Sequence, residues 1–319
     1  WGVLIAGFAQ LFFQLPFLHQ LNLLAKPKLN RSQEGLVRIK KLMVPALFGV
    51  SVTQINLLLD TFIASLLITG SVSWLYFSDR LMELPLGTFG IAIAVVVLPT
   101  LSRKHAESSG REFAETLDWA FRLICLIAIP STIGLVLLAE PLLITLFLSE
   151  NFTENDVVAA SGSLRAYAVG LLAFMAIKIF SPGYFSRQDT KTPVRIGMIA
   201  MLINMILNVV FYLYGMAHVG LALATSIAAF FNAGLLFWGL HKEKVFYFQS
   251  GWLSFIAQIF LANLVLVAFL LSLSREFPVW LSWPIGTQLL NLCILVFGGV
   301  FVYVVSLSLL GLRWRQIYR

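Results

Sequence analysis

Long apolar runs separated by short polar connections dominate the chain. A helix that crosses a bilayer needs about 20 apolar residues. Nine runs approach or exceed that length, at residues 1–24, 39–68, 74–101, 116–148, 158–185, 193–214, 217–240, 252–273 and 284–311. None shows the strict alternation of a membrane β-barrel strand. Because lipid cannot bond to backbone groups, the pattern predicts an all-α integral membrane protein, a polytopic bundle of about nine transmembrane helices.

Composition supports this class and excludes a soluble domain. The chain is 59% hydrophobic and 12% charged, with a mean hydropathy of +0.89, against roughly 45–50% and 25% in soluble proteins. Cys125 and Cys293 both lie in apolar runs and are interpreted as core residues, not as a disulfide. The chain begins at Trp1 inside an apolar run, without Met or a basic segment. We therefore expect it to be the C-terminal part of a longer protein.

The basic residues follow the connections in a regular way. Most of the 22 Lys and Arg residues lie in every second connection or in the tail. The first connection, KPKLNRSQEGLVRIKK, carries six of them, and the next, GSVS, carries none. The positive-inside rule places the basic connections and the C-terminus in the cytoplasm. The net charge of +7 thus marks topology and not nucleic-acid binding, although the first connection can also grip anionic membrane lipids.

Three charges interrupt the third run, in YFSDRLMELPLG at residues 76–87. Arg80 carries a planar guanidinium suited to phosphate oxygens, and Glu83 lies three residues on, on the same helix face. Pro85 removes a backbone hydrogen bond and predicts a bend beside them. This combination is typical of an anion-binding site in a transporter. An internal structural ion pair is the alternative, and Asp79 lies near enough to the interface to be solvated.

A second set of polar residues lies deep in the apolar runs. Asp60 falls within INLLLDTFIASLL, and Asn204 and Asn208 lie four residues apart, on one helix face, in the sixth run. Thr225 in the seventh run can join them. Oxygen ligands of this kind suit a hard cation, which makes sodium binding a candidate role. A protonation switch and interhelical hydrogen bonding remain open alternatives.

Other candidate residues are less specific. Lys178 precedes the helix-breaking Ser-Pro-Gly segment and either lines a cavity as a further substrate-binding residue or extends to the interface. Arg122 and Arg165 lie near run ends, which favours extension of their side chains to the interfaces. The sequence has no Gly-rich phosphate loop, HExxH or GxSxG motif. We therefore expect no enzyme activity and no resident cofactor.

Two stretches of the chain resemble a known family. GSVSWLYFSDRLMELPLGTFGIAIAVVVLPTLS resembles the eighth transmembrane region of the MurJ (MviN) lipid II flippases. SPGYFSRQDTKTPVRI resembles the connection between spans ten and eleven of the same family. MVPALFGVSVTQINLLLDTFIAS is similar to its seventh span. The likeness covers essentially the whole chain, although the last two runs match only in pattern.

The resemblance implies a domain arrangement. The family has fourteen spans in two six-helix lobes plus two C-terminal helices, and it belongs to the multidrug, oligosaccharidyl-lipid and polysaccharide exporter superfamily. This chain would supply spans six to fourteen. The implied parts are the last N-lobe helix at 1–24, a cytoplasmic basic linker at 25–38, the C-lobe at 39–242, and two additional helices with a cytoplasmic tail at 243–319.

The resemblance also implies a function. The family flips lipid II, an undecaprenyl diphosphate-linked disaccharide pentapeptide, across the bacterial inner membrane by alternating access for cell wall synthesis. Arg80 would belong to its cationic cavity, and Asp60, Asn204, Asn208 and Thr225 resemble a C-lobe cation site. Sodium, protons or membrane potential would drive the cycle, and enzymes of peptidoglycan synthesis are possible partners. An exporter of another polyprenyl-linked saccharide or a drug, and a non-transporting scaffold, are the alternatives.

Overall fold

The computed structural model describes residues 2–21, 43, 47 and 54–312. It separates the chain into two compact units, residues 1–44 and 45–319. In the first unit the described part is helix α1, Gly2–Gln20, which has Pro16 inside it and no buried residue. The predicted basic linker at 25–38 lies outside the described residues.

The second unit is built from helices, and its described residues contain no β-strand. It begins with a helical segment at residues 54–65. The helices that follow are α3 Ser71–Pro85, the π-helix η1 Leu86–Ile91, α4 Ala92–Ala106, α5 Gly110–Leu137, α6 Ala139–Phe147, α7 Glu154–Phe185, α8 Lys191–Leu213, α9 Ala217–Lys242, α10 Trp252–Leu273, α11 Phe277–Ser282 and α12 Ile285–Leu309.

The predicted fold class is confirmed. In the described part of the chain, eight helical segments are long and apolar enough to cross a membrane. Seven of them match predicted runs to within about five residues, and the predicted run 116–148 is divided into α5, which begins earlier at Gly110 and ends at Leu137, and short α6. The remaining run, 39–68, is described only in part, with the helix at 54–65 inside it. Short α11 falls in a segment predicted as a connection, where Pro278 occupies the first helical turn, a position that tolerates proline.

Prolines explain where two of the long helices break. Pro85 ends α3, and the chain continues through the π-helical turn η1 into α4, so the bend predicted beside the charges becomes a π-helix. In the fourth run the break falls at Leu138, between α5 and α6. Pro141 has no N–H to donate to the carbonyl of Leu137, which is where α5 ends. Pro130 stays inside α5.

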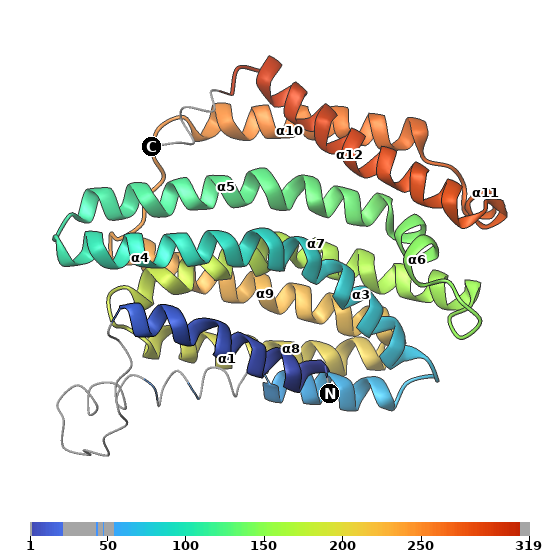
Figure 1. Cartoon of the computed structure of the whole chain (residues 1–319), viewed down its shortest axis with the longest axis horizontal. Helices are drawn as coiled ribbons and strands as arrows, with labels where there is room; N and C mark the ends of the chain where they lie inside the picture. The colour runs from blue at the N-terminus through green and yellow to red at the C-terminus, as the bar shows by residue number, and fades with distance from the viewer. Residues whose placement is uncertain (1, 22–42, 44–46, 48–53, 313–319) are drawn as a thin grey trace. The chain divides into compact units, whose positions relative to one another are not determined.

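Helix α7 lies in the middle of the second unit, against α3, α5 and α9 (Figure 1). Its contact with α9 depends on small residues, as is usual between membrane helices. A Cβ at Gly170 would lie 2.6 Å from the hydroxyl oxygen of Ser226, which donates to the Ala166 carbonyl at 2.7 Å. A Cβ at Gly239 would meet the hydroxyl of Tyr184. Both glycines therefore set the spacing of these helices.

Helices α10 and α12 pack on each other and form an outer layer over α5 (Figure 1). One hydrogen bond shows how the layers fit. Pro130 lacks the N–H that would bond to the Leu126 carbonyl, and the Tyr303 hydroxyl of α12 donates to that carbonyl instead, at 3.0 Å. Pro130 of α5 and the tyrosine of α12 are thus complementary.

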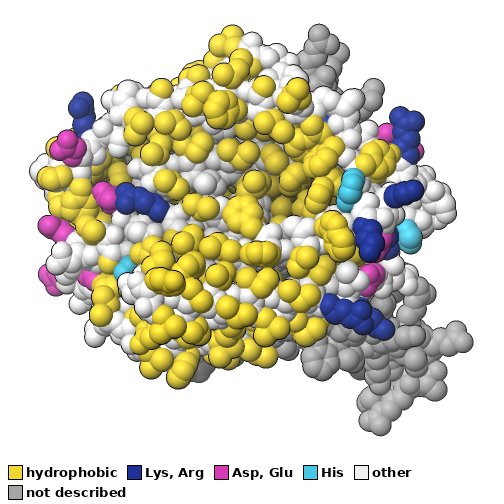
Figure 2. All heavy atoms as spheres, turned by 180° about the vertical axis from the view of Figure 1, so that it is seen from behind, with side chains coloured by type: hydrophobic (Ala, Val, Ile, Leu, Met, Phe, Trp, Pro, Cys, Tyr) yellow, Lys and Arg dark blue, Asp and Glu magenta, His cyan; other side chains and the backbone are white. Residues whose placement is uncertain are grey.

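The outer surfaces carry the apolar side chains that lipid requires. Figure 2 shows hydrophobic side chains over most of the drawn face, with charged side chains and His gathered toward its two sides. The most exposed large apolar residues include Leu213 on α8, Phe297 and Leu309 on α12, and Leu253 on α10. This distribution is typical of a protein whose solvent is the bilayer core.

Candidate substrate and cation sites

Arg80 and Glu83 form an open ion pair on α3. Arg80 Nη1 lies 2.8 Å from Glu83 Oε2, and the two side chains are 54% and 52% exposed. The guanidinium carbon lies 4.9 Å from the centre of the Tyr76 ring. The π-helical turn η1 begins three residues after Glu83, and such turns are frequent at functional sites. The pair therefore holds Arg80 in position while leaving its other N–H groups accessible to an anionic ligand.

Lys178 does not lie beside Arg80. The Ser78 hydroxyl donates to the Ala160 carbonyl at 2.7 Å, so Arg80 is level with the turn of α7 that follows Ala160. Lys178 lies further along α7, roughly 20–25 Å deeper at 1.5 Å per residue, and its side chain is exposed. The two cations are too far apart to hold one diphosphate group, although sequence reasoning placed both in the substrate site.

The predicted cation-site residues do come together. Asp60 Oδ1 accepts a hydrogen bond from Asn208 Nδ2 at 2.6 Å. We assign the Asn204 amide so that its nitrogen donates to Asp60 Oδ1 at 3.0 Å and its oxygen accepts from the Thr225 hydroxyl at 3.2 Å. Asn204 and Asn208 are almost fully buried. Residues from three helical segments far apart in sequence thus form one polar cluster.

Two features of this cluster were not predicted from the sequence. Asn56 lies one helical turn before Asp60 and donates to Asp60 Oδ2 at 3.0 Å, a spacing that the sequence could have shown. Asn208 Oδ1 is buried and has no hydrogen-bond partner among the described residues. A buried carbonyl oxygen without a donor needs an explanation, and a hard cation bound by carboxylate and amide oxygens supplies one.

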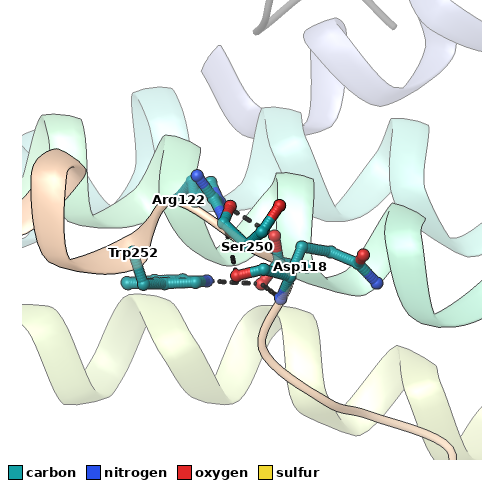
Figure 3. Close-up of polar contacts among 5 residues, drawn as sticks. Asp118, Arg122, Ser250 and Trp252 are labelled. Atoms are coloured by element: carbon teal, nitrogen blue, oxygen red, sulfur yellow. Dashed lines mark hydrogen bonds and ion pairs between the residues drawn. The ribbon is translucent and has the colours of Figure 1, made fainter.

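A third polar cluster is centred on Asp118 in α5, and its polar groups are bonded to other residues of the protein (Figure 3). The Asp118 carboxylate accepts hydrogen bonds from Trp252 Nε1 at 2.6 Å and from Arg122 Nε at 2.8 Å. Arg122 Nη2 donates to the Ser250 carbonyl at 3.0 Å, and its guanidinium lies 5.0 Å from the centre of the Trp252 ring. The cluster fastens the start of α10 to α5. Arg122 thus extends toward the connection between α9 and α10, where the protein itself supplies its partners.

Arg165 also has a defined partner. Its Nη2 lies 2.8 Å from Glu140 Oε1 at the start of α6, and its Nε donates to the Val136 carbonyl at 3.2 Å. That carbonyl belongs to the last turn of α5, where cations are favourable. The residue therefore links α7 to the break between α5 and α6.

The SPGYFSRQDTKTP connection is organised by Asp189. Its Oδ1 accepts from the backbone N–H groups of Lys191 and Thr192 at 3.1 and 3.0 Å. Burial acts to raise the pKa of this carboxyl, but the hydrogen bonds from Thr192 and Lys191 and the charge of Arg187 together lower it. Asp189 therefore stays ionised and caps the start of α8.

These observations define a class. Long apolar helices, a spanning helix with a π-helical turn beside an exposed arginine, and a buried Asp/Asn cluster between helices are typical of a polytopic helical membrane transporter. The family model for lipid II flippase MurJ matches residues 1–292. The chain belongs to the MurJ lipid II flippase family, a family of transporters and not of enzymes.

Individual relatives agree with this family. A probable lipid II flippase MurJ of Vibrio cholerae is 50% identical over 99% of this chain. One from Haemophilus influenzae is 48% identical, also over 99% of it. The chain spans 60% and 63% of the length of these two relatives.

Solved structures show the same fold. A lipid II flippase MurJ in an inward closed conformation matches 96% of this chain and 60% of its own length, with a TM-score of 0.71 and 27% identity. An outward-facing multidrug resistance transporter of the MATE family matches 85% of this chain and 63% of its own, with a TM-score of 0.57 and 16% identity. At that identity the second match shows the fold alone.

Proposed function

We propose that this chain forms the C-lobe and final helices of a flippase that moves lipid II from the cytoplasmic to the periplasmic leaflet of the bacterial inner membrane. Family membership supports this cargo, and the Arg80–Glu83 pair is the observation that carries it. A guanidinium inside an apolar span is costly, and this one is only half enclosed by the protein. A ligand with phosphate oxygens would satisfy it.

Arg80 would bind the lipid diphosphate through charge-assisted hydrogen bonds. Glu83 and the Tyr76 ring hold the guanidinium in place before the ligand arrives. Lys178, which lies much deeper along α7, would meet a different part of the cargo on its path. Alternating access then follows if this lobe rocks against a second one, and the π-helical turn η1 between α3 and α4 is a suitable place for bending.

The test uses the full-length protein that carries this chain, in cells depleted of their own lipid II flippase. Wild type, Arg80→Ala and a control, Arg275→Ala, are compared at matched membrane levels for exposure of lipid II to the periplasm. Arg275 is an exposed cation in the connection before α11. We expect wild type and the control to restore exposure, and Arg80→Ala to fail. Equal exposure by all three would contradict the role of Arg80, and failure of all three would contradict the cargo.

We also propose that Asp60, Asn204, Asn208 and Thr225 form a sodium site, joined by Asn56. The unpartnered Asn208 Oδ1 supports this assignment. Bound sodium would supply positive charge against the Asp60 carboxylate. The chain's own contribution is to hold that carboxylate between three amides, which links the segment at 54–65 to α8 and α9. Proton coupling and membrane potential are the competing driving forces.

Thermal unfolding in sodium chloride and in choline chloride tests the site separately from transport. Sodium should raise the melting temperature of wild type, because a ligand of the folded state stabilises it. Asp60→Asn should abolish the rise, whereas Asp79→Asn, a carboxylate lost outside the cluster, should retain it. An equal rise in Asp60→Asn would remove the assignment and leave protons or potential as the drive.

The orientation is proposed from the charge pattern, with the C-terminus in the cytoplasm. Single cysteines at Lys242 and Arg275 provide the test, because the two positions fall in connections that we expect on opposite sides. In intact cells an impermeant maleimide should label Arg275→Cys and not Lys242→Cys; the reverse result would invert the topology. If the orientation holds, the cytoplasmic and periplasmic connections are the surfaces open to enzymes of peptidoglycan synthesis.

A further inference from the structure

A cavity of about 490 Å³ opens where three connections of the chain meet, on the side proposed as cytoplasmic. The α4–α5 turn, the start of the α7–α8 connection and the residues after α9 form its wall. No Asp or Glu is among the described residues that line it. Its basic lining residues are Lys104, His105, Arg111, Arg187 and Lys244.

Several cations of this cavity pair with glutamates outside its wall. Three have a glutamate partner that does not line the cavity: Lys104 with Glu112 at 3.4 Å, Arg111 with Glu115 at 2.9 Å and Arg187 with Glu243 at 2.7 Å. The Lys104 and Arg187 side chains are each only 19% exposed. Lys244 makes no ion pair within the described part of the chain. Membrane topology requires basic residues in these connections, but it does not require them to converge and be fixed on one cavity.

Backbone conformation sets these three connections apart. Ser108, Gln188 and Lys244 follow α4, α7 and α9 with φ of 56°, 63° and 58°, and they are three of the four described non-glycine residues with positive φ. A side chain in this left-handed region costs free energy that glycine avoids. The chain uses glycine at four other such positions, Gly70, Gly215, Gly251 and Gly311. Ser108 and Lys244 both line the cavity, so their side chains are retained there against a local cost.

The cavity lies where membrane-spanning helices end, the level at which lipid headgroups are expected. Helix α4 ends at Ala106, α5 begins at Gly110 and α9 ends at Lys242, so the wall is formed where membrane-spanning helices end. Tyr247 and Phe113 also line it, and aromatic rings of this kind are common at the membrane interface. A mixed wall of cations, hydroxyls and aromatic rings suits a phosphate that carries an acyl-glycerol group.

We propose that this cavity binds the phosphate ester of an anionic phospholipid headgroup, with Lys104, Arg187 and Lys244 donating to the phosphate oxygens. Guanidinium and ammonium groups form charge-assisted hydrogen bonds of the stronger kind to phosphate, and basic pockets between membrane helices on this side bind anionic headgroups in other proteins. The site goes beyond the proposed transport function and does not depend on its cargo. Inorganic phosphate offers the same oxygens without the lipid, so the test includes both.

Lys244→Gly separates binding from folding. Glycine relieves the left-handed backbone at this position, so the melting temperature of the ligand-free variant should be unchanged or raised. The full-length protein in neutral detergent is titrated with dioctanoyl phosphatidylglycerol, dioctanoyl phosphatidylcholine or sodium phosphate, and binding is measured by native mass spectrometry and thermal shift. Lys242→Ala is the matched control, because it removes the same charge two residues away on a side chain that does not line the cavity.

We expect wild type and Lys242→Ala to bind phosphatidylglycerol in preference to phosphatidylcholine, and Lys244→Gly to bind it about tenfold more weakly, the loss expected for one hydrogen bond to a charged group. Equal phosphatidylglycerol binding by Lys244→Gly and wild type would overturn the site. A response to inorganic phosphate as strong as that to phosphatidylglycerol would keep the phosphate chemistry and overturn the lipid as its source.

Discussion

Two ion pairs with the same N–O distance lie in different surroundings in this molecule. Arg122 and Asp118 on α5 lie 2.8 Å apart, with side chains 24% and 4% exposed. Arg80 and Glu83 on α3 also lie 2.8 Å apart, yet both are more than half exposed. The first pair has its remaining donors and acceptors satisfied by Trp252 and the backbone before α10. The second pair has few other contacts.

The difference separates a structural charge from a functional one. A buried pair is stable only when hydrogen bonds satisfy its other polar atoms, and the Asp118 cluster meets that condition by joining α5 to α10. The Arg80 pair leaves guanidinium N–H groups accessible. These groups do not stabilise the fold, but they are available to an anionic ligand. Spacing along the helix cannot distinguish the two cases, whereas exposure and the surrounding partners can.

The largest effect is expected at Asp118. Asp118→Ala leaves the Arg122 Nε and the part-buried Trp252 N–H without their acceptor, and breaking a largely buried pair costs up to about 3–5 kcal/mol. Thermal unfolding in detergent should show a strong loss of stability. The matched control is Glu115→Ala, which breaks an exposed pair on the same helix with a distance of 2.9 Å and should cost at most about 0.5 kcal/mol. Similar losses in both variants would show that burial does not separate these pairs.

A smaller effect is expected at Tyr303. Tyr303→Phe removes the donor to the Leu126 carbonyl that Pro130 leaves open, and an unsatisfied buried acceptor costs about 1–3 kcal/mol. Tyr76→Phe changes the same group on the exposed α3 face and should alter the free energy of unfolding by less than about 0.5 kcal/mol. If Tyr303→Phe is neutral, the packing of α12 does not depend on the carbonyl that Pro130 leaves open.

The smallest effect is expected for the open pair itself. A double-mutant cycle of Arg80→Ala and Glu83→Ala should give a coupling energy for unfolding of roughly 0.2–1 kcal/mol, as for other exposed pairs. The equivalent cycle for Arg122→Ala and Asp118→Ala should give a clearly larger value. A large coupling at Arg80 would mean that this pair is structural and that its exposure is misleading.

Much of the fold follows from the sequence because hydropathy and proline act locally. The run at 252–273 has the same limits as α10, and the run at 158–185 differs from α7 only at its start. Pro85 correctly marks a bend, although the sequence did not predict its form, the π-helix η1, which packs against α7. The break at Leu138 falls between the two prolines that the sequence offers.

The polar clusters were predictable only in part. Asn204 and Asn208 lie four residues apart on one helix, so their shared face is visible in the sequence, and their juxtaposition with Asp60 follows once polar residues are required to pair. Asp118 lies in the same span as Arg122, but its partner Trp252 is 134 residues away. No local pattern joins such residues. Lys178 shows a distance that the sequence did not show, because helix rise separates it from Arg80, and its role as a substrate-binding residue stays a prediction.

Direct binding of undecaprenyl diphosphate to the full-length protein is the most direct test of the role proposed for Arg80. Wild type, Arg80→Lys and Arg80→Ala would be compared by native mass spectrometry in neutral detergent. We expect Arg80→Ala to bind about tenfold or more weakly, from loss of a hydrogen bond to a charged group. Arg80→Lys should fall between the two, because lysine keeps the charge without the planar fork. Equal binding by all three proteins would contradict the account and place the Arg80–Glu83 pair with the structural charges.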